Sequence, residues 1–273
     1  MLNRQSLPEI NRLSIVSAAI MLAFALTQIV SFPAQRISFT IFGILVPILV
    51  DFSTITTIFT AILAAAGMDW LIQSHPEKEK DALFLSYSRH WVVPILTTFV
   101  IGVVLNSFAG GAYWWVIYGL GSVLLVAVFI AEYNVVPPDE NKLPLAVIGL
   151  TGLSFALYFL LSVAVFSSNL RLFIRLPLLG IGALMAISRS LQLRLGRWLP
   201  LWALINSLAL SQLVVGFHYL PLSPIQSGLI LVGTAYSLTS LVTGIKEARK
   251  KWGLWGEPAA MLILMIFISL IWR

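Results

Sequence analysis

The sequence predicts an all-α fold, a polytopic transmembrane helix bundle, and three observations support this class. Of the 273 residues, 59% are hydrophobic and only 10% are charged, whereas a soluble domain carries roughly a quarter charged residues. The mean hydropathy of +0.95 leaves too little polar surface for a water-facing globule of this size. The apolar residues also fall into stretches of about 20, the length that crosses a bilayer as a helix. A soluble enzyme, a nucleic-acid-binding protein and a disordered scaffold are therefore not expected.

Nine segments have this length, and turn-forming residues separate them. In chain order they are Leu13–Val30, Ser53–Ile72, Trp91–Ala109, Tyr113–Ala131, Leu145–Phe166, Leu172–Ser188, Trp198–Phe217, Ile225–Ile245 and Pro258–Trp272. Glu257 and Pro258 suit a helix start, because proline fits the first turn and an acidic residue there favours the helix dipole. Since no loop is long enough for a soluble module, we expect one integral membrane domain over residues 1–273.

Residues 36–51 are the apolar segment that does not fit a spanning helix. Polar and apolar residues alternate from Arg36 to Ile41, which is typical of a strand. The following apolar run contains Pro47 and ends at Asp51. We therefore predict a small hairpin or re-entrant segment on the outer side of the membrane. The alternative is a tenth, short crossing helix over residues 37–50.

The distribution of basic residues predicts the orientation in the membrane. With nine crossings and a cytoplasmic N-terminus, 13 of the 17 basic residues face the cytoplasm, and Arg36, Arg171, Arg175 and Arg273 face outside. A tenth crossing would reverse the N-terminus and still leave most basic residues inside, so charge alone does not decide. We expect the protein in the bacterial cytoplasmic membrane, with its N-terminus in the cytoplasm and its C-terminus outside.

The run Gly67–Pro76, at the inner end of the second predicted helix, is the most distinctive motif. Asp69 and Gln73 are four residues apart and share a helical face, and His75 follows them. Asp69 and His75 could act on a metal or a lipid phosphate, or the run could be only a helix end with a proline stop. A metal site uses three or four ligands, and the chain has no cysteine. We therefore expect neither a metal nor another cofactor.

This run, the hairpin-like segment before it and the multi-helix remainder resemble an uncharacterised family of bacterial polytopic membrane proteins. The resemblance implies the membrane architecture and no catalytic roles.

Polar side chains are concentrated in the seventh and eighth predicted helices. The candidate pocket residues are Asn206, Ser207, Ser211, Gln212, Ser237 and Ser240. They could form an uncharged pocket for a lipid headgroup or a small polar solute. They could equally be interhelical hydrogen bonds, each worth ~1 kcal/mol. No ionisable residue lies near the middle of a predicted span, which argues against a pump or an ion-coupled carrier.

Two basic clusters are predicted at the cytoplasmic surface, after the sixth and eighth helices. Each basic residue near an anionic leaflet contributes about 1 kcal/mol to association with lipid, although such residues also simply orient the chain. Arg189 lies in the first cluster. The candidate lipid-binding residues are Arg194, Arg197, Lys246, Arg249, Lys250 and Lys251.

Arg171 and Arg175 are basic residues on the predicted outer side, four apart at the start of the sixth helix. They could bind a phosphate or carboxylate, pair with Asp51, or extend to the interface.

These observations predict a non-enzymatic multi-pass protein that binds lipid or has an accessory role, with anionic lipid at its basic cytoplasmic loops. One alternative is a membrane-embedded enzyme that acts on a lipid-linked substrate through Asp69 and His75. A second is a carrier of an uncharged or lipidic solute that uses the seventh and eighth helices. We expect no nucleic acid as a partner, and the sequence identifies no protein partner.

Overall fold

The computed structural model describes residues 8–30, 32–41, 44–75, 84–108, 110–136, 143–168 and 170–271. Within these residues, nine helices are long and apolar enough to cross a membrane, which confirms the predicted helix bundle. The long helices are α1 (Ile10–Ile29), α2 (Phe52–Gln73), α3 (Val92–Asn106), α4 (Ala112–Asn134), α5 (Leu143–Ser167), α6 (Leu172–Leu195), α7 (Pro200–Tyr219), α8 (Pro224–Lys246) and α9 (Lys251–Ile271). Strands β1 (Gln35–Ile41) and β2 (Ile44–Val50) precede α2, and the 3-10 helix η2 (Phe84–His90) precedes α3. The protein therefore spans a membrane.

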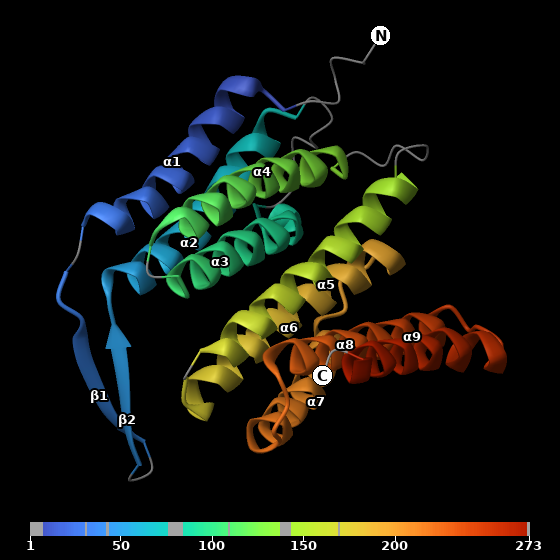
Figure 1. Ribbon diagram of the computed structural model, residues 1–273. Helices are drawn as coiled ribbons and strands as arrows, with labels where there is room; N and C mark the ends of the chain where they lie inside the picture. Colours follow the sequence, from blue (N-terminus) through green and yellow to red (C-terminus); the bar gives the residue numbers. More distant parts are fainter. Residues whose placement is uncertain are drawn as a thin grey trace.

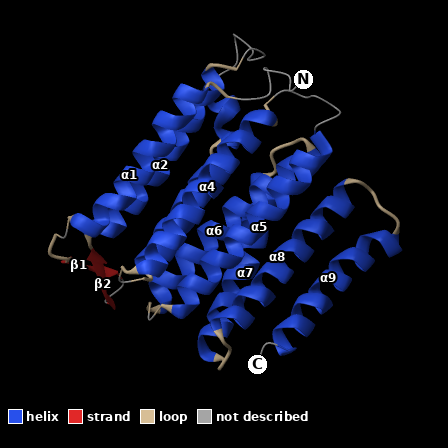
Figure 2. Ribbon diagram, turned by 45° about the horizontal axis from the view of Figure 1, so that its top comes forward, coloured by secondary structure: helices blue, strands red, loops and turns tan. Residues whose placement is uncertain are grey.

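Successive helices run in opposite directions, so the bundle has two distinct ends (Figures 1 and 2). The hairpin end carries β1 and β2 and the starts of α2, α4, α6 and α8. The opposite end, called the basic end below, is where α6 and α8 finish. It carries Arg194, Arg197, Lys246, Arg249 and Lys250.

The predicted small hairpin is present at residues 35–50, so residues 37–50 are not a tenth helix. Its strands pair antiparallel, with Ser38 opposite Pro47. Pro47 has no N–H to donate, and it is tolerated because both strands of a two-stranded ribbon are edges. Asp51 then begins α2 as its N-cap, accepting hydrogen bonds from the backbone N–H and the hydroxyl of Thr54 at 2.7 and 2.6 Å.

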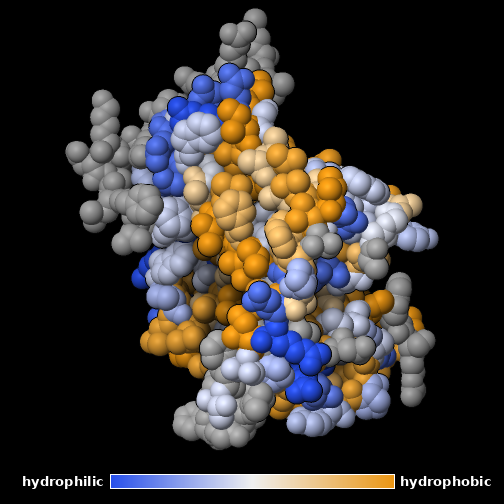
Figure 3. All heavy atoms as spheres, turned by 90° about the vertical axis from the view of Figure 1, so that its left-hand side faces the viewer, coloured by the Kyte–Doolittle hydropathy of each residue, from blue (hydrophilic) through white to orange (hydrophobic). Residues whose placement is uncertain are grey.

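Two clusters of buried apolar side chains form the core, and α3 contributes to both. Ile101 of α3 belongs to the cluster formed with α1, α2 and α4, whereas Val100 belongs to the cluster formed with α5, α6, α7 and α8. The outward faces are also apolar, as a lipid-facing surface requires. On the side that carries the hairpin and α1, hydrophobic residues lie between hydrophilic residues near the top and near the bottom of the view (Figure 3).

Most helix ends differ from the predicted spans by a few residues, and the later ends of α4 and α6 contribute to the site described below. α4 continues to Asn134 instead of Ala131, and α6 continues to Leu195 instead of Ser188. The predicted start of the last helix at Glu257 and Pro258 is wrong, because α9 already begins at Lys251 and contains Pro258. A proline within a helix removes one intrahelical hydrogen bond, and the helix continues past it to Ile271.

Candidate functional site

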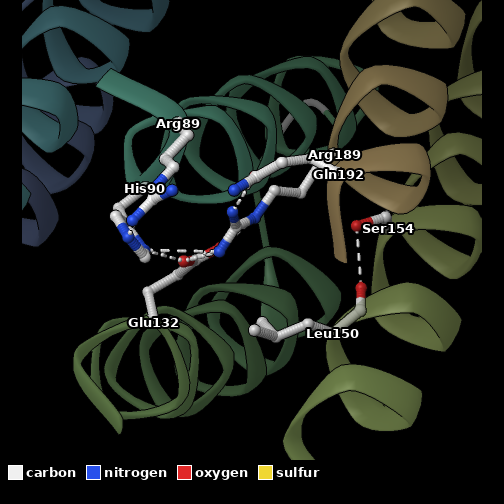
Figure 4. Close-up of polar contacts among 7 residues, drawn as sticks. All are labelled: Arg89, His90, Glu132, Leu150, Ser154, Arg189 and Gln192. Atoms are coloured by element: carbon white, nitrogen blue, oxygen red, sulfur yellow. Dashed lines mark hydrogen bonds and ion pairs between the residues drawn. The ribbon is translucent and has the colours of Figure 1, made fainter. Parts of the chain in front are cut away.

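A cluster of charged side chains is buried near the basic end, between η2, α4 and α6 (Figure 4). Glu132 and Arg189 are both 0% exposed. Arg189 Nε donates to Glu132 Oε1 at 3.0 Å, and its Nη2 pairs with Oε2 of the same carboxylate. Arg189 Nη1 donates to the Gln192 side chain. The two parallel contacts between the Arg189 guanidinium and the Glu132 carboxylate are the strongest geometry for such a pair.

His90 completes this cluster. Its Nδ1 lies 2.9 Å from Glu132 Oε2 and 3.3 Å from Arg189 Nη2, and its Nε2 lies 3.3 Å from Arg89 Nε. Because an ionised carboxylate only accepts, His90 Nδ1 is the donor to Glu132. Glu132 accepts hydrogen bonds from both Arg189 and His90, which compensates for the removal of its charge from water.

This cluster was missed by the sequence analysis because of where the predicted spans end. Glu132 and Arg189 directly follow the predicted ends at Ala131 and Ser188, so both fall outside the predicted spans. Arg189 is a buried residue of α6 and not part of a surface basic cluster. One signal was available in the sequence. An acidic residue directly follows one predicted span and a basic residue directly follows another, and both spans finish at the same membrane face. The cluster fixes the last turns of α4 and α6 against η2.

A groove of about 810 Å³ lies between α5, α8 and α9. Leu193 and Arg194 of α6, which directly follow Gln192, line one part of it. Both α5 and α9 pack against α8 (Figure 2). The apolar lining comprises Val147, Ile148, Phe155, Ala156, Phe159, Leu193, Leu229, Val232, Met261 and Met265. The polar lining comprises Thr151 on α5 and, toward the basic end, Arg194, Tyr236, Thr243, Glu247, Arg249 and Glu257. The groove is therefore apolar along its length and charged at one end.

The charged end of the groove is organised around Glu257. Its Oε1 accepts a hydrogen bond from the Tyr236 hydroxyl at 2.8 Å, and its Oε2 accepts one from Arg249 Nη1 at 3.0 Å. Arg194 lies 3.8 Å from Glu257 Oε1, and its guanidinium is 4.9 Å from the centre of the Tyr236 ring. Arg249 also donates to Glu247 at 2.7 Å, and this hydrogen bond raises the pKa of the Arg249 guanidinium. Both arginines thus lie beside Glu257 at the mouth of the groove.

The predicted lipid-binding residues divide into two groups. Arg194 and Arg249 line the groove. Arg197, Lys246 and Lys250 are exposed at the same end. Lys251 is the first residue of α9, and its side chain lies outside the described residues.

The predicted pocket residues do not line the groove. Ser207 donates to the Gly180 carbonyl of α6 at 2.6 Å, and Ser237 donates to the Pro258 carbonyl of α9 at 2.8 Å. Ser211 bonds within α7, to the Ser207 carbonyl. Of the remaining three candidates, Asn206 and Ser240 are buried and Gln212 is exposed. At least two of the six therefore connect neighbouring helices.

Asp69 and His75 each have a partner on their own side of the bundle. Asp69 accepts a hydrogen bond from Gln73 at 2.7 Å. His75 is buried, with its ring 4.6 Å from the Tyr133 ring. Neither residue lines the groove, and their catalytic role stays a prediction.

Comparison with protein families supports the architecture without adding an activity. Residues 32–272, from before β1 to the end of α9, match the family model described as "Protein of unknown function (DUF5656)". No curated protein and no solved structure matches the chain.

Proposed function

Because the chain belongs to the DUF5656 family, whose description assigns no activity, we propose its function from the groove between α5, α8 and α9. The protein is a non-enzymatic membrane protein that binds an anionic lipid. The headgroup lies at the basic end beside Arg194 and Arg249, and an acyl chain lies along the apolar part of the groove. The observation that carries this proposal is one continuous groove with apolar walls and one charged end.

The size and openness of the groove support an amphiphilic ligand. Its volume of about 810 Å³ falls within the range of roughly 300–1,000 Å³ that is typical of ligand pockets. Three of its lining residues on α5 are exposed, Ile148, Gly152 and Ala156, so the groove opens toward the lipid-facing surface. A lipid can therefore enter sideways while its headgroup stays at the membrane face.

The charge at the basic end favours an anionic headgroup. The described acidic residues that line the groove there are Glu247 and Glu257, and both already accept hydrogen bonds from Arg249. The basic residues outnumber them and comprise Arg194, Arg197, Lys246, Arg249 and Lys250. With the predicted orientation, this end faces the negatively charged cytoplasmic leaflet, where each basic residue adds about 1 kcal/mol of attraction. The bacterial cytoplasmic membrane fits this orientation.

The first test measures which lipid the purified protein retains. We expect wild-type protein from mixed phosphatidylglycerol and phosphatidylcholine membranes to retain phosphatidylglycerol preferentially, as seen by native mass spectrometry. The double variant Arg194→Gln, Arg249→Gln should lose this preference. Arg12→Gln is the matched control, because Arg12 lies at the start of α1, away from the groove, and pairs with Glu9. Equal retention of both lipids by the wild type would contradict the proposal.

The second test fills the apolar part of the groove without changing any charge. Gly152 lines the groove, and a Cβ built there meets no atom within 4 Å. Gly152→Leu should therefore fold normally and retain less lipid of either kind. Gly216→Leu on α7 is the control, since a Cβ there also meets nothing within 4 Å and Gly216 does not line the groove. If both variants retain as much lipid as the wild type, the acyl chain does not lie in this groove.

The two other functions predicted from the sequence have less support. An enzyme acting through Asp69 and His75 would need substrate access beside both residues, and neither contributes to the groove. A carrier using α7 and α8 would need a pocket reaching from Asn206 to Tyr236, whereas the groove includes only Tyr236. Both stay predictions.

A further inference from the structure

Arg175 is a buried cation at the hairpin end, on the opposite side of the bundle from the charged end of the groove. Its side chain lies between the end of α5 and the end of α7 and is only 8% exposed. Nη1 donates to His218 Nδ1 at 3.0 Å, and Nη2 donates to the Ser168 carbonyl at 3.1 Å. The guanidinium lies 4.9 Å from the centre of the Phe166 ring. None of these partners is an acidic residue, and Nε is buried without any hydrogen-bond partner.

Arg175 has no counter-ion within the part of the chain that the structure describes. Neither Arg175 nor Arg171 forms an ion pair there. Among the described acidic residues, only Asp51 lies at the hairpin end, and its carboxylate caps α2 through Thr54. The predicted pairing of Asp51 with the arginines is therefore not observed. A buried charge without a partner is unfavourable, so this position favours an anion from outside the chain.

Further donors surround the same position. Because arginine only donates, His218 Nδ1 is the acceptor and the ring proton is on Nε2, where it can be donated to a ligand. Arg171 is the exposed N-cap residue of α6 and makes no side-chain capping bond. The first N–H groups of a helix lack intrahelical partners, and the helix dipole is positive at that end. Arg175 and His218 are thus in contact, and Arg171 lies one helical turn before Arg175 at the start of α6. None of the three forms an ion pair with an acidic residue of the described chain.

We propose that Arg171, Arg175 and His218 form a binding site for a phosphate group at the hairpin end. The phosphate belongs to a phospholipid headgroup in the leaflet at this end or to inorganic phosphate in solution, since the same donors recognise both. Arg171 contributes an accessible charge, and Arg175 contributes the buried charge that the anion compensates. This site is independent of the proposed lipid groove, because it lies at the other end of the bundle and shares no residue with it.

Histidine NMR provides a direct test, because the chain has only three histidines, His75, His90 and His218. Protein labelled with ¹⁵N-histidine is purified in a phosphate-free maltoside detergent. Inorganic phosphate is titrated into one sample and phosphatidylglycerol into another. We expect the ring signals of His218 to shift while those of His75 and His90 do not. A shift with phosphatidylglycerol alone identifies the lipid as the source, and a shift with inorganic phosphate, alone or as well, identifies a site open to solution. No shift with either compound, or equal shifts of all three histidines, overturns the proposal.

Variants of the exposed Arg171 test the charge argument without disturbing the buried residue. Arg171→Gln should weaken binding of the titrated compound by at least about tenfold, because one charge-assisted contact is lost. Arg171→Glu places a carboxylate one helical turn from Arg175. We expect it to raise the Tm of the ligand-free protein and to abolish the His218 response. Arg36→Gln, which removes a cation from β1 at the same end, is the control and should respond like the wild type. If Arg171→Gln and Arg171→Glu also respond like the wild type, the site does not exist.

Discussion

The buried pair of Glu132 and Arg189 is stabilised by the number of its hydrogen bonds and by its position near the end of two spans. Glu132 accepts two hydrogen bonds from Arg189 and one from His90. Arg189 also donates to Gln192, and the following residues of α6 line the groove. The pair therefore connects the packing of α4 and α6 to the position of Arg194.

Removing one member of this pair should be costly, because the other remains buried and charged. We expect Glu132→Gln to lower the free energy of unfolding by about 3–5 kcal/mol, measured by denaturation in detergent micelles. Glu9→Gln is the control, since the pair of Glu9 and Arg12 is partly exposed and such pairs contribute about 1 kcal/mol or less. The double variant Glu132→Leu, Arg189→Met should recover much of the loss. Equal effects of Glu132→Gln and Glu9→Gln would show that the buried pair contributes little.

At the residue scale, part of the site could be predicted from the sequence. Arg194 and Arg249 were recognised as lipid-binding candidates from their basic clusters, and both line the groove. Glu132 and Arg189 were not recognised, because a charge directly after an apolar run has the same pattern whether the helix stops or continues. Only the packing of α4 against η2 and α6 decides between these possibilities. The prediction that no ionisable residue lies near a span centre does not conflict with this, since both residues lie toward the helix ends.

Helix α8 holds the C-terminal part of the bundle together, since α5, α7 and α9 all pack against it. Its contact with α9 depends on Gly233. A Cβ built at Gly233 would lie 2.6 Å from Met265 Cβ, an atom close to the α9 backbone. Small residues at such positions let membrane helices approach closely. Since Met265 also lines the groove, this approach sets the position of one groove wall.

Adding a methyl group at this contact should separate the two helices. We expect Gly233→Ala to lower the free energy of unfolding by about 1–3 kcal/mol, the usual cost of overpacking, and to reduce lipid retention. Thermal unfolding and native mass spectrometry measure the two effects. Gly216→Ala provides the comparison, because it gives α7 the same better helix former without meeting any atom within 4 Å. A Gly233→Ala protein as stable as Gly216→Ala would contradict this account of the α8–α9 contact.

At the element scale, the hairpin was predictable and the groove was not. Alternation in Arg36–Ile41 and the polar stop at Asp51 are local signals, and the strands form where these signals place them. The groove depends on the distance between α5 and α9 where both pack against α8. This distance cannot be predicted from the sequence of any one helix. The start of α9 was misplaced because proline marks a first turn in many helices, whereas Pro258 lies well inside this one.

The whole molecule places its hairpin and most of its described basic residues at opposite ends of the bundle. Five spanning helices, α2 to α6, lie between β1 and the loop after α6, so these two segments lie on different sides of the membrane. The predicted orientation puts the basic end in the cytoplasm, in accordance with the positive-inside rule. The number of spans was predictable because apolar length is set by bilayer thickness.

Cysteine labelling tests this arrangement cleanly, because the chain has no native cysteine. Thr40→Cys lies in β1, and Arg197→Cys follows α6; both positions are exposed. We expect a membrane-impermeant maleimide to label Thr40→Cys in intact cells and to label Arg197→Cys only after the membrane is opened. The reverse pattern would invert the orientation, and labelling of both from one side would contradict the number of crossings.

The nine crossings of the described chain place the start of α1 and the end of α9 on different sides of the membrane. A cargo protein fused before α1 and another fused after α9 would reside in different compartments, whichever way the chain inserts. A split reporter with its halves attached at those two points would therefore never reassemble within one molecule. If one half were attached before α1 and the other in the turn between α6 and α7, both halves would lie in the same compartment.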